Sequence, residues 1–328
     1  VQTCALPICL NIEMGPVAFC PVPVSDDMFS CLVRPPLQVI PVHTAFCSLC
    51  YVIMTAVMTV RVISLASSSV YGNAYLVAWG PTAVLIDCGV PLRRLEKSLY
   101  ELGIDPRRIA AVFVTHEHGD HIKALQLKNP FPQRHGIKVF APKLFWYAAQ
   151  GIACLGSELR CTLEAGVAVT VGSLKVVAFS KSHDAIAPLG FRVTAPDGTS
   201  ASIVTDLGEV TADVMRGAFD SDYLIWESNH DHQLELASGR PYSLIKRVLG
   251  NFGHLSNDQA GQGLSSLVTE RTRGVMLAHL SLDCNTPDLA VRTVAPYLRR
   301  SRFAGLLTVA HASEVTILAD IEVGSKEA

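Results

Sequence analysis

The chain has 328 residues, of which 49% are hydrophobic and 17% are charged, and its formal net charge is −2. This composition excludes a disordered chain, and the length suffices for one large core or two modest ones. The charge excludes a globally basic nucleic-acid-binding surface, so that any site for a polyanion has to be a local patch.

The N-terminal part of the chain differs from the rest. Six of the ten cysteines lie in the first 50 residues, and this part is rich in proline and lacks helical or strand periodicity. The charge-free run at 35–60 is long enough to cross a bilayer, but prolines interrupt it and no basic start precedes it, as a signal peptide would require. The opening VQTCALPI resembles translated cloning-adapter sequence. We therefore expect residues 1–57 to be non-native or disordered, and the natural start to be Met54 or Met58.

The other four cysteines bear on the compartment of the protein. They are scattered over the rest of the chain, whereas a secreted scaffold would spread disulfide pairs through its fold. We therefore expect reduced thiols, a cytoplasmic location and no membrane partner for the folded domain, residues 58–328.

After the N-terminal segment, short apolar runs predict strands. In chain order, they lie at residues 60–66, 74–80, 82–89, 110–116, 167–172, 174–180, 190–195, 201–206, 223–228 and 275–281. A helix is expected at 92–103, where leucines recur on one face and a glycine ends the pattern. Further helices are expected to start at Pro241, Ser256 and Pro287. The chain begins with strand pairs and continues with alternating strands and helices, and this order then recurs. Such an order suggests an α/β sandwich with two inner sheets and outer helices.

The stretch THEHGDH (115–121) places three of the eleven histidines within seven positions, directly after a predicted strand. In extended chain, His116 and His118 point the same way, and the glycine that follows lets the backbone turn before Asp120 and His121. One metal ion can lie between the first pair and a second ion between the other pair. Nitrogen and oxygen ligands of this kind suit Zn²⁺ or Mn²⁺.

Four other strand ends carry side chains of the same kinds. They are Asp87, His183, Asp206 and His279. Strand ends and the loops that follow them are where α/β folds keep their chemistry. Each residue alone could be an ordinary loop residue, but together with THEHGDH they predict a metal site in a cleft.

In this order, the motifs resemble those of the metallo-β-lactamase superfamily, over residues 60 to about 320. The resemblance implies a four-layer αββα metallo-β-lactamase sandwich that binds two divalent metal ions, Zn²⁺ or Mn²⁺. It implies that the first ion is held by His116, His118, His183 and Asp206, and the second by Asp120, His121, Asp206 and His279. It also implies that Asp87 orients a ligand histidine, and we expect Asp120 to take part in catalysis.

The residue type at position 206 favours one branch of the superfamily. Enzymes that hydrolyse lactams usually carry cysteine or serine there, whereas phosphodiesterases use a carboxylate that can bridge two metals. Two ions about 3.5–4 Å apart suit in-line attack of a bridging hydroxide on phosphorus. Asp206 therefore indicates a dinuclear phosphodiesterase.

His254 is a candidate proton donor for such a reaction. It lies just before Ser256-x-x-Gln259, a capping box that starts a helix. The histidine of a matching Gly-His-Ser motif in the superfamily's transfer-RNA 3′-processing enzymes protonates the leaving group, and by this resemblance His254 has the same role. The alternative is an incidental histidine beside a capped helix start.

Longer blocks of sequence narrow the resemblance. LIDCG, THEHGDHIKAL, SHDAIAPLGF and PYSLIKRVLGNFGHLSND are among eight blocks that resemble, in order, the WalJ/YycJ-type bacterial metallo-hydrolases. The first loop, SSSVYGN, departs from that family by one added residue and one lost glycine. The resemblance implies 5′-to-3′ exonuclease activity on double-stranded DNA, a role in DNA repair and DNA as the partner. It leaves a homodimer open.

Other side chains near the motifs are further candidates. In ESNHD, Glu227, His230 and Asp231 either line the cleft or form a hydrogen-bonded strand end, and we favour the cleft. Glu117 should point away from the ligands, and His232 should be exposed. Basic residues that either contact DNA or form only a solvated face are Lys123, Lys128, Arg240, Lys246 and Arg247.

Two other functions compete with DNA cleavage. The first is a small-molecule metallo-hydrolase of the same fold, which would act on a cyclic phosphodiester or a thioester. An extended basic groove would favour DNA, and a closed pocket would favour a metabolite. The second is a non-catalytic regulatory partner, against which the complete set of ligand residues argues.

We predict that a chain starting at Met58 folds and binds metal like the full chain, because residues 1–57 lack periodicity and precede the first expected strand. Thermal unfolding and metal content are the measurements, with the full chain as the control. Clear loss of either property would show that the N-terminal segment belongs to the domain.

Overall fold

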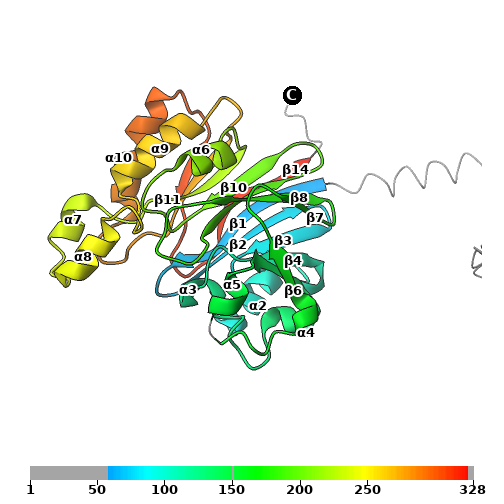
Figure 1. Cartoon of the computed structure of the whole chain (residues 1–328). Helices are drawn as coiled ribbons and strands as arrows, with labels where there is room; N and C mark the ends of the chain where they lie inside the picture. Colours follow the sequence, from blue (N-terminus) through cyan, green and yellow to red (C-terminus); the bar gives the residue numbers. More distant parts are fainter. Residues whose placement is uncertain (1–57, 150, 324–328) are drawn as a thin grey trace, which may run out of the picture. The chain divides into compact units, whose positions relative to one another are not determined.

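Two seven-stranded sheets lie face to face in the computed structural model, which describes residues 58–149 and 151–323 (Figure 1). The prediction for residues 1–57 lies outside the described residues. The first sheet has the order β14-β1-β2-β3-β4-β5-β6. Its strands are β1 (Met58–Ser68), β2 (Gly72–Trp79), β3 (Thr82–Ile86), β4 (Ile109–Phe113), β5 (Lys138–Pro142), β6 (Arg160–Leu163) and β14 (Thr316–Val323).

The second sheet has the order β13-β12-β11-β10-β9-β8-β7. Its strands are β7 (Ala168–Val171), β8 (Leu174–Ser180), β9 (Leu189–Thr194), β10 (Ser200–Val204), β11 (Tyr223–Glu227), β12 (Gly274–Ala278) and β13 (Leu306–Val309). Strands β10 to β13 are parallel, as are β3 to β6 in the first sheet. Parallel strands bring their carboxyl ends to one edge of a sheet, which is where α/β folds place their sites.

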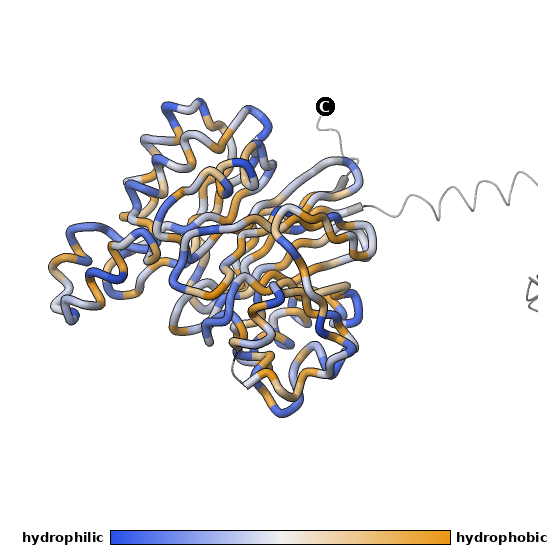
Figure 2. The backbone as a smooth tube through the Cα atoms, in the orientation of Figure 1, coloured by the Kyte–Doolittle hydropathy of each residue, from blue (hydrophilic) through white to orange (hydrophobic). Residues whose placement is uncertain are grey.

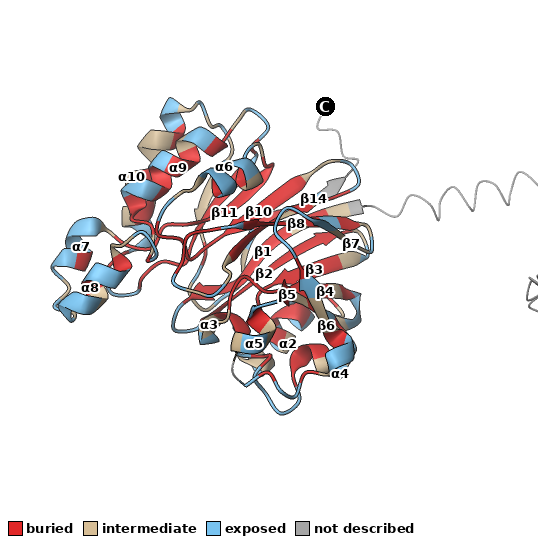
Figure 3. Cartoon of the chain, in the orientation of Figure 1, coloured by how far each residue is buried: buried red, intermediate tan, exposed pale blue. Residues whose placement is uncertain are grey.

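Helices cover the outer face of each sheet (Figure 1). The segments of the first sheet contain α2 (Leu92–Glu101), η1 (Pro106–Arg108), α3 (Gly119–Ile122), α4 (Phe131–His135), α5 (Phe145–Ala148) and η2 (Ser157–Leu159). The segments of the second contain α6 (Ala212–Ala218), α7 (His232–Leu236), α8 (Tyr242–Val248), α9 (Asn257–Leu267) and α10 (Pro287–Arg300). Helices α7 and α8 project from the sandwich and are mostly exposed (Figure 3). Within the described ranges, no helix is long and apolar enough to span a membrane.

The central strands contribute side chains to two cores each, because both faces of each sheet are covered. In β2, Leu76 packs towards the helices of the first sheet, whereas Val77 packs between the sheets. In β11, Ile225 packs between the sheets, and Leu224 packs against the helices of the second sheet. These strands therefore have continuous apolar sequences (Figure 2), and the expected αββα sandwich is confirmed.

Strands β5, β6, β13 and β14 were not predicted from the sequence. Three of them, β6, β13 and β14, are edge strands, and an edge strand is covered by fewer neighbours, so its apolar pattern is weaker. In β14, for example, Ile317 and Ile321 are 45% and 43% exposed. The strand predicted at 82–89 ends early, at Ile86, and its last residues belong to a loop.

Three predicted site residues have left-handed backbone conformation within two residues of a strand end. Asp87, Asp206 and His279 have φ angles of 66°, 59° and 56°, and they follow the ends of β3, β10 and β12. Such a conformation costs a non-glycine residue roughly 1–2 kcal/mol, so the surrounding contacts have to maintain it. The turn ends each strand abruptly and leaves the functional side chain at the sheet edge.

The loop after β3 packs directly against the loop after β4. The Cys88 N–H donates to the carbonyl oxygen of His121 over 2.8 Å. A Cβ atom on Gly89 would lie only 1.6 Å from the carbonyl oxygen of Asp120. Glycine is therefore required at position 89 by the close approach of two backbones.

We predict that Gly89→Ala lowers the free energy of unfolding by about 3 kcal/mol or more, because backbone atoms cannot move aside as a flexible side chain does. Metal binding should weaken too, since the displaced loop carries Asp120 and His121. The control is Gly103→Ala, where a Cβ would meet no atom within 4 Å and only the φ of +66° opposes the change. Urea unfolding compares the variants, and equal destabilisation would contradict this interpretation.

Candidate metal centre

Three histidines form one cluster beyond the ends of β4 and β8. His116 and His118 follow β4, and His183 follows β8. The Nε2 atom of His116 lies 3.0 Å from Nδ1 of His118, and Nε2 of His183 lies 3.3 Å from the same nitrogen. Ligand atoms of all three lie within 4.8 Å of one another, which is close enough to hold one cation.

A second cluster joins the first turn of α3 to the end of β12. The Oδ2 atom of Asp120 lies 3.4 Å from Nε2 of His121 and 3.7 Å from Nε2 of His279. These three ligand atoms also lie within 4.8 Å of one another. The two sheets thus contribute jointly, since Asp120 and His121 follow β4 of the first sheet and His279 follows β12 of the second.

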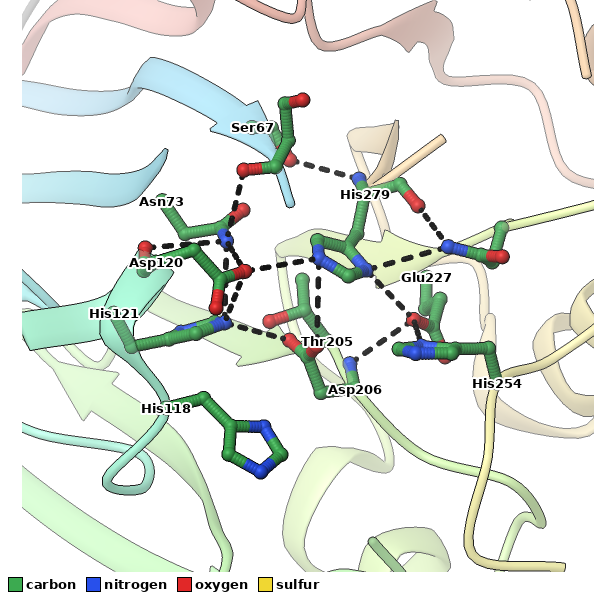
Figure 4. A network of polar contacts seen from close by, with 12 residues as sticks. Ser67, Asn73, His118, Asp120, His121, Thr205, Asp206, Glu227, His254 and His279 are labelled. Carbon is green, nitrogen blue, oxygen red and sulfur yellow. Dashed lines mark hydrogen bonds and ion pairs between the residues drawn. The ribbon is translucent and has the colours of Figure 1, made fainter. Parts of the chain in front are cut away.

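Asp206 lies between the two clusters. Its Oδ2 atom is 3.3 Å from Nε2 of His121, and its Oδ1 atom is 3.4 Å from Nε2 of His279, as Figure 4 shows. Its carboxylate also groups with His116 and His121 as a set of possible ligands. One carboxylate therefore faces ligand candidates from both clusters.

The chemistry of these side chains fits divalent metal ions. All of them offer imidazole nitrogens or carboxylate oxygens, the donors that zinc and manganese accept. Among the described residues, neither Oδ2 of Asp206 nor Nε2 of His279 has a neighbour in hydrogen-bonding geometry, although both atoms are buried and lie near other ligand candidates. Buried polar atoms normally have such partners, and a bound cation would satisfy both.

The charges of the side chains at the centre also favour a bound metal ion. Burial alone would lower the pKa of His279, but the neighbouring carboxylates, Asp206 first, raise it to about 10. Burial would likewise raise the pKa of Asp206, but His279 and His121 hold it well below its usual range. The carboxylates therefore attract positive charge, which a metal ion would supply.

Asp87 supports the ligand histidines of the first sheet. Its Oδ2 atom lies 2.7 Å from Nδ1 of His121, and its Oδ1 atom accepts the Thr115 N–H over 2.8 Å. The Thr115 hydroxyl donates to Asp87 and lies 2.8 Å from Nδ1 of His116. Asp87 thus orients His121 directly and His116 through Thr115, a residue that the sequence analysis did not identify.

Glu227 has the corresponding position in the second sheet. It is fully buried, and its carboxylate accepts the backbone N–H groups of Asp206, Leu207 and Leu255 over 3.2, 3.0 and 3.1 Å. Its Oε1 atom also lies 2.8 Å from Nδ1 of His254 and 3.1 Å from Nδ1 of His279. Because five donors surround this carboxylate, it orients histidines rather than offering a free ligand atom.

The Glu227 carboxylate keeps its negative charge in this environment. Burial alone would raise its pKa, but the charge and the hydrogen bond of His254, together with the hydrogen bond of His279, hold that pKa well below its usual range. The contact with Glu227 occupies Nδ1 of each histidine. Their Nε2 atoms are therefore the ones left for a metal ion or a substrate.

A pocket of about 290 Å³ opens onto the centre. It is lined by Ser69, His118, Gly119, Asp120, His183, Asp206, Arg247, His254 and His279. The predicted capping box at Ser256 is present at the start of α9, and His254, two residues before it, borders the pocket. Arg247 adds a positive charge that two hydrogen bonds to Asp184 hold in place, of which the one from Nη2 is 3.0 Å long.

The remaining candidates lie elsewhere. His230 joins none of the clusters that could hold a metal; it is buried, and neither ring nitrogen has a hydrogen-bond partner among the described residues. Asp231 caps α7 by accepting two backbone N–H groups. Neither residue is among those that line the pocket, so the favoured cleft position stays a prediction for both. Glu117 points away as expected, towards the Ile186 N–H.

The basic candidates are separated as well. Arg240 forms ion pairs with Glu235 and Asp283, which neutralise it. Three lysines are exposed near the metal loop or on α8, namely Lys123, Lys128 and Lys246. Of the five basic residues, only Arg247 lines the pocket.

The turn between β1 and β2 adds two contacts that the sequence analysis did not identify. Asn73 donates from Nδ2 to Oδ2 of Asp120 over 3.1 Å, and the Ser67 hydroxyl accepts the His279 N–H over 2.8 Å. Ser67 and Asn73 are the first and last residues of SSSVYGN, the segment in which the sequence departs from its family. The departure drew attention to this segment in the sequence, but it did not predict these two contacts.

Comparison with known proteins is consistent with this geometry. A family model described as beta-lactamase superfamily domain matches residues 82–279. The exodeoxyribonuclease WalJ of Streptococcus pneumoniae is 30% identical over 243 residues, which are 73% of this chain and 88% of that protein. The exodeoxyribonuclease YycJ of Bacillus anthracis is 29% identical over 242 residues, 73% of this chain and 90% of that protein.

A solved structure supports the fold. The metallo-beta-lactamase fold protein YhfI from Bacillus subtilis superposes with a TM-score of 0.59 at 16% identity, over 79% of this chain and 99% of that one. At this identity the likeness concerns the arrangement of sheets and helices alone.

We predict that Asp206→Ala lowers the metal content at both positions, because its carboxylate faces ligand candidates of both clusters. Elemental analysis of the purified variant measures this, with Asp213→Ala on the exposed surface of α6 as the control. Undiminished metal content would rule out a bridging role, and loss of a single ion would assign Asp206 to one position.

Proposed function

From the premise that this chain belongs to the beta-lactamase superfamily, we propose that it is a metal-dependent phosphodiesterase that acts on DNA. The specific activity that we propose is 5′-to-3′ exonuclease action on double-stranded DNA, with a role in DNA repair. The observation that supports it most is the carboxylate of Asp206 between two clusters of ligand candidates, an arrangement suited to two metal ions. The similarity to two exodeoxyribonucleases over most of their lengths supports DNA as the substrate.

In this proposal each of the two clusters supplies the ligands of one ion. His116, His118 and His183 would hold the first, Asp120, His121 and His279 the second, and Asp206 would contact both. When bound, such ions activate water and neutralise the charge that develops on a phosphate group. Asp87 and Glu227 keep the ligand imidazoles in their orientation through Nδ1.

His254 has the position expected for a proton donor. Glu227 holds its Nδ1 atom, and the ring borders the pocket beside His183 and His279, with ring centroids 5.4 and 5.2 Å away. A donor on the pocket wall can protonate the oxygen that leaves phosphorus. We assign this step to Nε2 of His254.

Arg247 would contact the phosphate of the substrate. A guanidinium presents several N–H donors in a plane, and two of the Arg247 donors bond Asp184, which fixes the side chain while leaving others for a ligand. The donors that Asp184 leaves free suit the oxygens of a phosphate group.

The direct test is an assay with duplex DNA that carries a label at the 5′ or the 3′ end, in the presence of Zn²⁺ or Mn²⁺. We expect early release of a labelled mononucleotide from the 5′-labelled DNA and slower loss of label from the 3′-labelled DNA. A panel of cyclic phosphodiesters and thioesters is assayed in parallel. Turnover of a panel member without DNA cleavage would replace this proposal by the small-molecule alternative.

We predict that His254→Ala keeps its metal ions and fold but loses roughly 10²- to 10⁴-fold in the rate of DNA cleavage, the usual contribution of a general acid. The loss should shrink on a nitrophenyl phosphodiester, because a good leaving group departs without protonation. The control is His232→Ala, an exposed histidine on α7. Equal losses on both substrates would exclude a proton donor, and loss of metal would make His254 a ligand instead.

A further inference from the structure

Five large, exposed apolar side chains lie close in the chain to residues that line the pocket of the metal centre. They are Val70, Tyr71, Ile186, Phe252 and Leu282, which are 62%, 40%, 51%, 64% and 51% exposed. We call them the apolar rim. They come from four loops, and each lies within three residues of a side chain that lines the pocket. Single exposed apolar residues are ordinary, but a group around a site indicates binding.

Phe252 is the member of the rim best placed for a ligand. Its carbonyl oxygen accepts the Asp184 N–H over 3.0 Å, and the next carbonyl, that of Gly253, lies 3.2 Å from Nδ1 of His183. The backbone at Phe252 is therefore fixed to the loop that carries a metal-ligand candidate. Two residues of chain span at most about 7 Å, so Phe252 also lies close to His254.

The Phe252 ring is available, in contrast to the other aromatic ring of the rim. Tyr71 is covered by the guanidinium of Arg94, which lies 5.6 Å from the ring centroid. In the described part of the chain, no aromatic ring or guanidinium stacks on Phe252. An exposed planar ring beside an anion-binding pocket can take a second planar group.

The pocket is polar and the rim is apolar, and this difference indicates which kind of ligand would bind to both. The pocket carries metal-ligand candidates and Arg247, which suit a phosphate group, whereas the rim suits an apolar, planar group one step away. A nucleotide has both parts. In an intact duplex even the terminal base is paired and keeps one face on its neighbour, so an unpaired nucleotide can bring its base to the ring more freely.

We propose that Phe252 stacks on the base of an unpaired terminal nucleotide while its phosphodiester lies in the pocket. The protein then acts on frayed or single-stranded ends in preference to paired ones. This inference rests on the proposed function and specifies its substrate. Stacking of a base on an aromatic side chain is sequence-tolerant, because every base has a π-face, so no preference among the four bases is implied.

The test compares two DNA duplexes that each end in one unpaired 5′ nucleotide, either intact or abasic. With the intact end, Phe252→Ala should raise KM about 5- to 100-fold, the range that base stacking on an aromatic side chain provides, and leave kcat nearly unchanged. With the abasic end, the same variant should match the unaltered protein. Phe252→Trp should restore the KM. The matched control is Phe219→Ala, which is 50% exposed, directly follows α6 and precedes β11, whose opposite end carries Glu227.

Each other outcome has a distinct meaning. Equal losses on the intact and the abasic ends would show that Phe252 supports the loop and does not bind a base. No loss on either would assign the rim to a different occupant. Either result would overturn this inference alone, provided that the unaltered protein cleaves both DNAs. If the unaltered protein cleaves neither, the proposed function fails, and the inference fails with it.

Discussion

The buried carboxylate of Glu227 connects the parts of the centre that lie on the second sheet. It stands at the end of β11, between the parallel strands β10 and β12, and accepts backbone N–H groups from the loop after β10 and from the segment before α9. Burying a carboxylate without partners would be costly, so these contacts compensate for its burial while they fix both segments. The positions of Asp206, His254 and His279 all depend on this one side chain.

Asp87 has a comparable role on the first sheet. Both acids are fully buried at the ends of strands. Asp87 contacts Nδ1 of His121 and Glu227 contacts Nδ1 of His279, and the Nε2 atoms of both histidines lie near the carboxylates of Asp120 and Asp206. Each sheet thus orients its own share of the ligands, and the ligands of the two sheets meet in the middle. A metal ion bound there would link the two halves of the sandwich, so metal binding and stability are expected to be coupled.

The surface around the centre indicates local rather than extended recognition. Among the basic candidates, Arg240 pairs with two carboxylates and Arg247 with that of Asp184, but of the two only Arg247 lines the pocket. Together with the formal net charge of −2, this agrees with a local site for a phosphate group rather than an extended basic surface. Polar groups in the pocket and apolar side chains around it would then bind different parts of one ligand.

The sequence by itself determined the fold and the set of ligand candidates. Apolar runs indicate buried strands, and motifs such as THEHGDH place imidazoles at strand ends. The strands and the ligand candidates can therefore both be predicted from the sequence. The tertiary structure decided which side chains support them. Ser67 contacts His279 across 212 positions, Glu227 contacts His254 across 27, and Arg247 contacts Asp184 across 63. Hydrogen bonds are short and directional, so such pairs form only where separate loops meet. Sequence periodicity predicts which residues are buried, but it does not predict which loops become neighbours.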